Sequence, residues 1–235
     1  MQSKRMQLFI LPYAGGSIAA FKRLTDMIDD SIDVITVEYA GRGTRAKDAL
    51  AKSIEELLDD AILYCRKRRD PSIPYAVMGY SMGSVLAYEM LAGNVLEGEL
   101  NHLFIAAEVS PKDRFLELRK VENPTDERVL ERAKKLGGLD ERMLTDKRFA
   151  DIYLRPMLSD YRLFFSYHYS EHTKKIIVDT TFFYCEKDTA FTDVQKWDEL
   201  IDGQFDFHEL GDNHFFINQH YKEMANVINS VLTGN

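Results

Sequence analysis

The sequence predicts an α/β fold in which a mostly parallel central sheet is flanked by helices. Short apolar runs of strand character recur along the chain, and stretches with helical periodicity separate most of them. This alternation is interrupted once, between about residues 111 and 173, where charged helical patterns follow one another without a convincing strand. Because strands that alternate with helices usually pair in parallel, we expect a parallel sheet with one helical insertion.

Six apolar runs define the expected strands. The first, at residues 7–12, follows a charged stretch that resembles the start of a secretory leader, but its apolar core is short and ends at Pro12 and a glycine pair. A buried strand explains it better. No apolar run approaches the roughly 20 residues that span a bilayer, so we expect a cytoplasmic protein. The other runs cover residues 33–39, 75–80, 102–108, 180–185 and 205–210.

Two helices are expected from their apolar periodicity. Residues 82–91 continue as a helix directly after the third strand-like run. Residues 53–68 carry an apolar stripe at the i, i+3, i+4 spacing of a helix that buries one face. The stripe is formed by Ile54, Leu57, Leu58, Ala61, Ile62 and Cys65.

The interruption at residues 111–173 is expected to fold as several short helices, because prolines and glycines punctuate it. Residues 112–150 hold 11 Lys or Arg against 9 Asp or Glu, so this piece is slightly basic within an acidic protein. A solvated helical face is the simplest interpretation of these charges. The punctuating residues are Pro111, Pro124, Gly137, Gly138 and Pro156.

Length and composition favour one compact domain covering residues 1–235. The chain has 45% hydrophobic and 29% charged residues, which is ordinary globular composition, and its formal net charge of -8 opposes binding to nucleic acid or to an anionic membrane. The two cysteines, Cys65 and Cys185, lie far apart in the sequence without the paired spacing of a zinc site. We therefore expect no metal and no disulfide.

One serine stands at a predicted sharp bend. Residues 79–83 read Gly-Tyr-Ser-Met-Gly and lie between a strand and a helix, as the G-x-S-x-G nucleophile elbow requires. Such a turn raises the serine hydroxyl above the sheet edge and places it at a helix N-terminus, whose free N–H groups can bind an oxyanion. Ser81 is thus the predicted nucleophile. The alternative is an ordinary strand-to-helix turn in which Ser81 caps the helix.

A serine nucleophile needs a base, and His214 is the best candidate. It follows the last predicted strand and precedes the final helix, where a chain order of serine, acid, histidine requires it. For the other five histidines, packing or solvated surface is the better interpretation. They are His102, His168, His172, His208 and His220.

The acid should follow a strand and lie between the serine and the histidine in the sequence. Asp188, just past residues 180–185, is the first choice because its carboxylate could orient the imidazole. Asp113 also follows a strand and is a competitor. Asp193, which starts a helix, and Asp212, which crowds the histidine, are weaker candidates.

Two backbone amides are expected to form the oxyanion hole. One donor in such folds is the residue after the nucleophile, here Met82, and the other comes from an early strand-to-helix loop. Residues 11–17, Leu-Pro-Tyr-Ala-Gly-Gly-Ser, fit that loop, with Ala14 as the candidate donor. Alternatively, the glycine pair only makes a tight turn.

These motifs together resemble the type II thioesterases that accompany nonribosomal peptide and polyketide synthases. The resemblance covers nearly the whole chain and includes GYSMG, LPYAGGS, YAGRGTR, KKLGG, LRPMLSDYRLFFSYHY, YCEKD and GDNHFF. It implies an α/β-hydrolase fold and a lid at about residues 112–170. It also implies Ser81, Asp188 and His214 as the triad, with the amides of Ala14 and Met82 as the oxyanion hole.

The same resemblance implies a function. The substrates would be acyl or aminoacyl thioesters on the phosphopantetheine arm of acyl or peptidyl carrier proteins, with no cofactor of the enzyme's own, and we expect a monomer. The slightly basic insertion suggests contacts to an acidic carrier protein through Arg114, Arg119, Lys134 and Lys135. Two other functions stay open: a stand-alone esterase or acyltransferase with the same triad, and a noncatalytic binding module on a hydrolase scaffold.

The chain departs from the family's usual pattern at three places. Tyr80 stands where the family usually has histidine, Ala40 and Gly43 alter its P-G-R-E segment, and residues 212–213 replace a more glycine-rich approach to the histidine. None of these changes removes a catalytic atom. The change at Tyr80 is expected to alter hydrogen bonding beneath the elbow.

Overall fold

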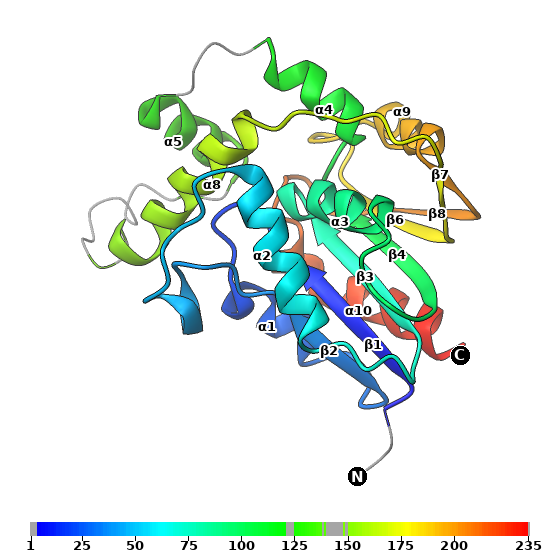
Figure 1. Ribbon diagram of the computed structural model, residues 1–235. Helices are drawn as coiled ribbons and strands as arrows, with labels where there is room; N and C mark the ends of the chain where they lie inside the picture. Colours follow the sequence, from blue (N-terminus) through cyan, green and yellow to red (C-terminus); the bar gives the residue numbers. More distant parts are fainter. Residues whose placement is uncertain (1–3, 121–124, 138, 140–147, 149, 235) are drawn as a thin grey trace.

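The computed structural model describes residues 4–120, 125–137, 139, 148 and 150–234, and is built on a six-stranded sheet (Figure 1). The strands follow the order β2-β1-β3-β4-β6-β8, and every neighbouring pair is parallel. The predicted parallel α/β sheet is confirmed. Its strands are β1 (Met6–Leu11), β2 (Ile32–Thr36), β3 (Tyr75–Tyr80), β4 (Leu100–Ala106), β6 (Thr180–Tyr184) and β8 (Phe205–Glu209).

Two strands end two or more residues earlier than their apolar runs predicted. The second run extends to residue 39, but β2 ends at Thr36, and beyond it the side chains of Glu38 and Tyr39 bond to the N–H of Ile18 and the carbonyl of Pro12. The fourth run extends to residue 108, but β4 ends at Ala106, because Ala107 has a φ of 53° and leaves the extended region.

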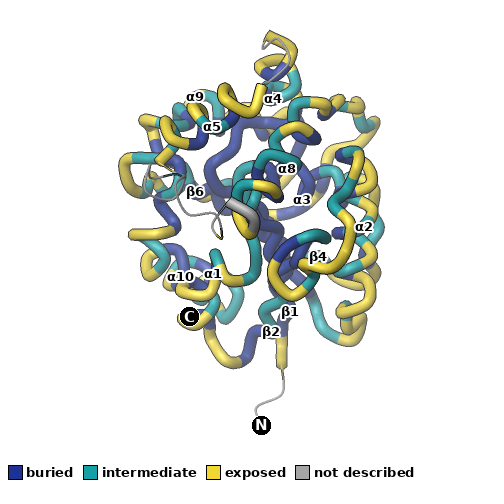
Figure 2. Tube along the Cα trace, turned by 90° about the vertical axis from the view of Figure 1, so that its left-hand side faces the viewer, coloured by how far each residue is buried: buried dark blue, intermediate teal, exposed yellow. Residues whose placement is uncertain are grey.

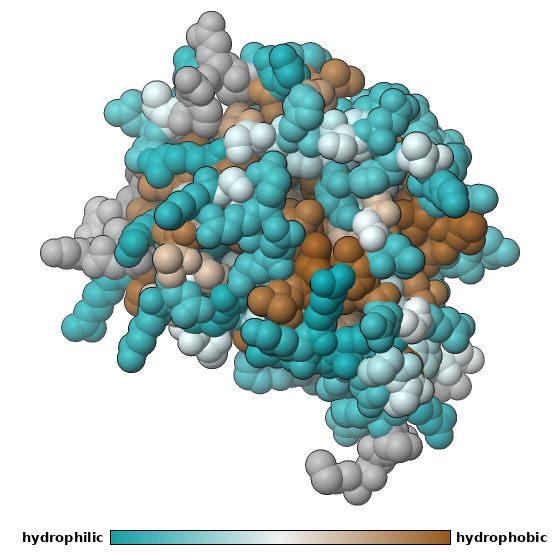
Figure 3. Space-filling view, viewed as in Figure 1, coloured by the Kyte–Doolittle hydropathy of each residue, from teal (hydrophilic) through white to brown (hydrophobic). Residues whose placement is uncertain are grey.

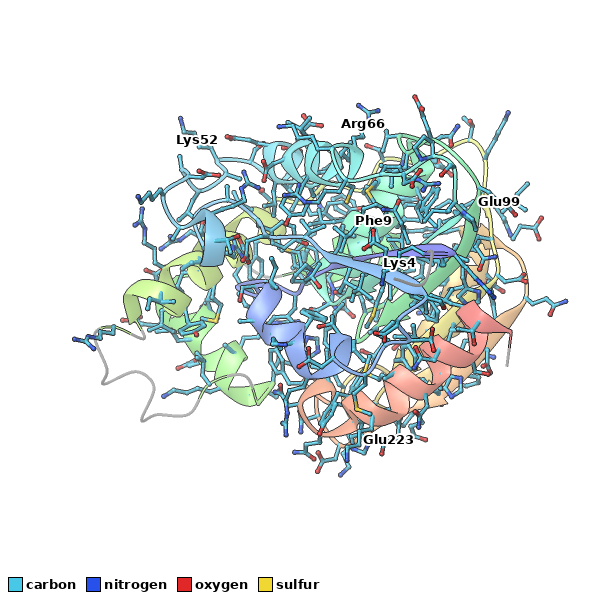
Figure 4. All side chains as sticks on the ribbon, turned by 90° about the horizontal axis from the view of Figure 1, so that it is seen from below. Lys4, Phe9, Lys52, Arg66, Glu99 and Glu223 are labelled. Carbon is cyan, nitrogen blue, oxygen red and sulfur yellow. The ribbon has the colours of Figure 1, made fainter. Side chains whose placement is uncertain are left out.

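Helices cover both faces of the sheet. Helices α1 (Ile18–Thr25) and α10 (Ile217–Thr233) bury apolar side chains against one face, and α2 (Ile54–Arg66) and α3 (Met82–Ala92) bury theirs against the other. Figure 2 shows buried residues in dark blue in the interior, and β1, β3 and most of α3 consist of such residues. In Figure 4, Phe9 lies inside the body, whereas Lys52 and Glu223 lie at its periphery.

Among its described residues the insertion contains helices and no strand, although residues 166–173 at its end are not helical. Its elements are α4 (Pro111–Leu118), α5 (Asp126–Lys135), the π-helical turn η2 (Ala150–Leu154) and α8 (Arg155–Phe165), and they lie beyond the carboxyl ends of the strands (Figure 1). Pro111 and Pro156 stand in the first turns of α4 and α8. Residues 121–124, 138, 140–147 and 149 lie outside the described residues. They include Pro124 and Gly138, two of the predicted punctuating residues.

Short elements that the sequence did not predict flank the last strands. A second sheet pairs β5 (Ile176–Ile177) with β7 (Ile201–Asp202) in parallel. Helix α9 (Phe191–Val194) and the 3-10 turn η3 (Gln195–Glu199) follow the loop after β6. Two-residue strands and one-turn helices are too short to have a recognisable period, so sequence patterns cannot find them.

The surface seen in Figure 3 is mostly polar, and the two cysteines lie in the interior. The face in Figure 3 is mostly hydrophilic, with apolar residues gathered in limited areas. Cys65 and Cys185 are buried free thiols in the apolar clusters on opposite faces of the sheet, so they cannot pair. Within the described residues, no cluster of side chains could hold a metal ion, and no helix is long and apolar enough to cross a membrane.

Candidate active site

Ser81 occupies a strained turn between β3 and α3. Its φ of 51° and ψ of −124° lie outside the regions that non-glycine residues normally adopt. Its backbone N–H donates to the carbonyl of Ala106 at 2.8 Å, and its carbonyl accepts from the N–H of Ser84 at 2.7 Å. Ser81 stands at the N-cap position, but its side chain makes no capping hydrogen bond. Helix capping therefore does not explain this serine.

The two glycines of the elbow allow close backbone contacts. A Cβ atom at Gly79 would lie 2.3 Å from Cα of Ser84, and one at Gly83 would lie 2.0 Å from the carbonyl oxygen of Leu11. Both obstacles are backbone atoms, which a rotamer change cannot move. The glycines therefore let α3 approach both β3 and the end of β1.

Gly83→Ala is expected to destabilise the protein by at least about 1–3 kcal/mol, because the new methyl group forces α3 away from β1. Gly93→Ala is the matched control at the other end of α3. There, the nearest atom to a new Cβ is a side-chain carbon of Val95 at 3.2 Å, and we expect little loss. Urea denaturation of both variants measures the difference. Equal stability would refute the close-packing explanation.

Ser81, Asp188 and His214 line one cavity of about 120 Å³ at the carboxyl edge of the sheet. These three residues come from the loops after β3, β6 and β8. The insertion supplies the opposite wall through α4, α5 and α8. Further residues of the lining include Ala14, Glu108, Arg114, Arg132, Tyr161 and Phe164.

The His214 ring is oriented by one carboxylate. Its Nδ1 lies 2.7 Å from Oδ2 of Asp188, and the two side chains are 7% and 12% exposed. The competing acids bond elsewhere. The carboxylate of Asp113 accepts from the hydroxyl of Ser110, Asp193 accepts from Nζ of Lys196, and Asp212 accepts from the amide of Asn213. The geometry thus favours Asp188 over the alternatives that the sequence left open.

The other five histidines do not line this cavity. His102 is buried with its Nε2 at 2.8 Å from the hydroxyl of Thr181, and burial lowers the pKa of His102 to about 4. His168 packs its ring on Phe115. The remaining three pair with carboxylates: His172 with Glu89, His208 with Asp206 and His220 with Glu223. Their packing and surface roles agree with the interpretation made from the sequence.

The two predicted oxyanion donors lie near Ser81. Met82 is the first residue of α3, so its N–H has no acceptor within the helix. Ala14 lies in a tight turn closed by the N–H of Gly16 donating to the carbonyl of Tyr13 at 2.7 Å, and Ala14 lines the same cavity as Ser81. A second cavity of about 120 Å³ shares Ala14 and Tyr161 with the first. Ala14 thus stands between two cavities.

Tyr80 connects the elbow to the loop that carries His214. Its buried hydroxyl donates to the carbonyl of His214 at 2.6 Å and accepts from the N–H of Ile217 at 3.4 Å. Burial raises the pKa of Tyr80 well above its ordinary value, so the hydroxyl keeps its proton. The ring packs against Tyr13 and Phe216. The residue that departs from the family pattern therefore supports the backbone of His214 from below.

Tyr80→Phe is expected to lower the free energy of unfolding by about 1–3 kcal/mol, because it leaves the buried carbonyl of His214 without a donor. We also expect a lower kcat, since the loop that carries the imidazole loses an anchor. Thermal unfolding and steady-state kinetics measure the two effects. Tyr184→Phe, at the more exposed end of β6, is the control for removal of a tyrosine hydroxyl. No change in either quantity would contradict the role of Tyr80.

A buried ion pair in the cavity was not anticipated from the sequence. Glu108 accepts from Nε of Arg114 at 2.7 Å, and Arg114 also donates to Glu117 at 2.6 Å. Burial raises the pKa of Glu108 despite the attraction of Arg114. The sequence held one signal for Glu108, because an acid just beyond the end of a strand is a candidate site residue. The predicted strand, residues 102–108, included Glu108 and so concealed that position. Arg114 is 8% exposed. It therefore cannot be one of the carrier contacts suggested above, whereas Arg119, Lys134 and Lys135 are exposed.

Comparison with protein families and with known proteins found matches over nearly the whole chain. The family model for the thioesterase domain matches residues 6–232. The medium-chain S-acyl fatty acid synthase thioesterase of Rattus norvegicus is 25% identical over 215 residues, which are 90% of this chain and 81% of that protein. Thioesterase PikA5 of Streptomyces venezuelae is 25% identical over 233 residues, covering 97% of this chain and 81% of that protein.

A solved structure has the same fold. The thioesterase RedJ from the prodiginine biosynthetic pathway of Streptomyces coelicolor superimposes with a TM-score of 0.81. The match covers 97% of this chain and 86% of that chain, at 24% sequence identity. At this level of sequence identity, the structural similarity shows that the two proteins share the α/β-hydrolase fold.

Proposed function

Because this chain belongs to the thioesterase family, we propose that it hydrolyses acyl or aminoacyl thioesters tethered to the phosphopantetheine arm of carrier proteins. One observation carries the proposal: Ser81, on its strained turn, and the His214–Asp188 pair line a single cavity. In a serine hydrolase these groups serve as nucleophile, base and orienting acid. The residues of the cavity need no metal or cofactor for that chemistry.

The first half of the proposed reaction acylates the serine. Oγ of Ser81 attacks the thioester carbonyl carbon while Nε2 of His214 takes the hydroxyl proton. The N–H groups of Met82 and Ala14 stabilise the oxyanion, and losing one such donor typically costs about 2.7–4 kcal/mol. The carbon–sulfur bond then breaks, and His214 gives its proton to the leaving thiolate.

The second half releases the acid. Water attacks the acyl-serine carbonyl as His214 takes one of its protons, and the oxyanion again lies at Met82 and Ala14. Collapse of this intermediate returns the proton to Ser81 and frees the carboxylic acid. Asp188 holds the imidazole tautomer and stabilises its cation through both halves.

Relatives from biosynthetic pathways support a proposal for the biological role. They include thioesterase PikA5 and the gramicidin S biosynthesis protein GrsT of Aneurinibacillus migulanus. We therefore propose that this enzyme edits nonribosomal peptide or polyketide synthesis by clearing stalled or misprimed acyl groups from carrier domains. Residues 112–170 would act as its lid, with exposed Arg119, Lys134 and Lys135 facing the acidic carrier.

The decisive experiment incubates the protein with carrier proteins bearing several acyl and aminoacyl groups and follows unloading by intact mass. Turnover of loaded carriers that Ser81→Ala lacks supports the proposal. Rapid hydrolysis of simple oxygen esters with no carrier unloaded would favour a stand-alone esterase instead, and products joined to an added alcohol or amine would identify an acyltransferase. Failure of wild-type Ser81 to react with a fluorophosphonate would indicate a noncatalytic binding module.

A further inference from the structure

A buried ion pair joins the insertion to the loop that carries Ala14. Both oxygens of Asp160, in the middle of α8, accept from the guanidinium of Arg42, in the loop after β2, with the Nη2–Oδ1 distance at 2.7 Å. The side chains of Arg42 and Asp160 are 3% and 1% exposed. Such a two-bond pairing fixes both the distance and the relative plane of the two groups.

The same two side chains bind the backbone next to Ala14. Oδ2 of Asp160 accepts from the N–H of Gly15 at 2.7 Å, and Nη1 of Arg42 donates to the carbonyl of Gly16 at 3.4 Å. The N–H of Gly15 belongs to the peptide group that follows Ala14. Asp160 therefore sets the orientation of that peptide directly beside the proposed oxyanion donor.

Packing reinforces this connection. Gly15 has a φ of 79°, and a Cβ atom there would lie 2.6 Å from Cβ of Met157. Met157 stands three residues before Asp160, so both lie on the same side of α8. Helix α8 therefore packs against the backbone of Gly15. The position of α8 and the position of the loop that carries Ala14 thus depend on each other.

The electrostatics of the Arg42–Asp160 pair favour a role in orienting the loop over a role in stabilising the fold. Removing two charges from water offsets much of their attraction, and a buried pair often stabilises a fold no better than apolar side chains of similar size. Nε of Arg42 is also buried without a hydrogen-bond partner. What an apolar pair could not provide is an acceptor for the N–H of Gly15.

We propose that Arg42 and Asp160 are positioning residues for the oxyanion hole, which hold the Ala14 peptide in its donating orientation and make that orientation depend on the seating of α8. This inference rests on the proposed function, because it requires the Ala14 amide to bind the oxyanion. It also assigns a role to the YAGRG segment, whose Arg42 is distant in sequence from every triad residue.

The test compares single variants with a doubly apolar one. Arg42→Met and Asp160→Leu each leave one buried charge without its partner, so both are expected to lose stability as well as activity. The double variant Arg42→Met/Asp160→Leu removes both charges and should regain most of the Tm that the single variants lose, although the N–H of Gly15 stays without its acceptor. Its kcat on a small-molecule thioester should nevertheless stay about 10- to 100-fold below wild type, with KM changed less than about threefold, because one donor is misoriented.

A transition-state analogue gives a readout that mere structural support would not move. A trifluoromethyl ketone forms an oxyanion on Ser81, so its affinity for the double variant should weaken in parallel with kcat/KM. The control is Arg45→Met/Asp60→Leu, which removes another two-bond pair, between Arg45 of the same loop and Asp60 of α2, with distances of 2.7 and 2.9 Å. We expect the control to retain wild-type kcat and analogue affinity.

The outcomes separate this inference from the proposed function. A folded double variant with wild-type kcat and analogue affinity overturns the positioning role alone. Wild-type protein that cleaves small thioesters but unloads no carrier overturns the carrier assignment alone, because the comparison of variants uses small thioesters. Wild-type protein inactive on every ester overturns both.

Discussion

Ser81→Ala is expected to lower the turnover of every ester and thioester substrate by roughly 10⁴-fold or more, because the acyl-enzyme can no longer form. Stability should change little, since the Ser81 side chain makes no capping bond to α3 and alanine removes only the hydroxyl. Steady-state kinetics on a small thioester and thermal unfolding of the same sample measure the two quantities together.

Ser53→Ala provides the opposite pattern as a control. The hydroxyl of Ser53 accepts from the N–H of Glu56 at 3.1 Å and caps α2, so its loss should cost about 1 kcal/mol of stability without affecting turnover. Activity retained in Ser81→Ala, or labelling of that variant by a fluorophosphonate at the wild-type rate, would exclude Ser81 as the nucleophile.

Asp188→Asn is expected to lower kcat by about 10⁴-fold at neutral pH while leaving the fold intact. The asparagine amide can donate to Nδ1 of His214, which places the remaining ring proton on Nε2. That tautomer cannot accept the hydroxyl proton of Ser81. Kinetics on a small thioester, with circular dichroism to confirm folding, measure the effect.

Two carboxylates near the site are the controls for Asp188. Asp193→Asn alters a residue that lines the same cavity but bonds to Lys196, and Asp113→Asn alters a carboxylate in the first turn of α4 that accepts from the hydroxyl of Ser110. Both variants should keep kcat within about tenfold of wild type, since neither carboxylate orients the imidazole. A loss in either control as large as that in Asp188→Asn would reassign the acid.

The main elements of the fold could be predicted because local patterns encode them. The apolar run at residues 75–80, which ends within Gly-Tyr-Ser-Met-Gly, predicts β3 with the bounds that the structure has, and the stripe that starts at Ile54 predicts α2. The elements missed include β5, β7, the short helix α9 and the 3-10 turn η3, which are too short for a recognisable strand or helix period. The elbow was also predictable, since its motif is contiguous.

The sequence by itself determined which elements form, where Ser81 bends the chain and which histidine lies late enough to serve it. It left four aspartates as candidates for the catalytic acid, suggested Arg114 as a surface contact and assigned no role to Arg42. Only the tertiary structure decided that Asp188 reaches His214, that Tyr80 supports the His214 backbone and that Arg42 meets Asp160 beside Gly15. The physical reason is separation along the chain: periodicity is a property of neighbouring residues, whereas these bonds join residues 26 to 145 positions apart, which only packing of the finished fold brings together.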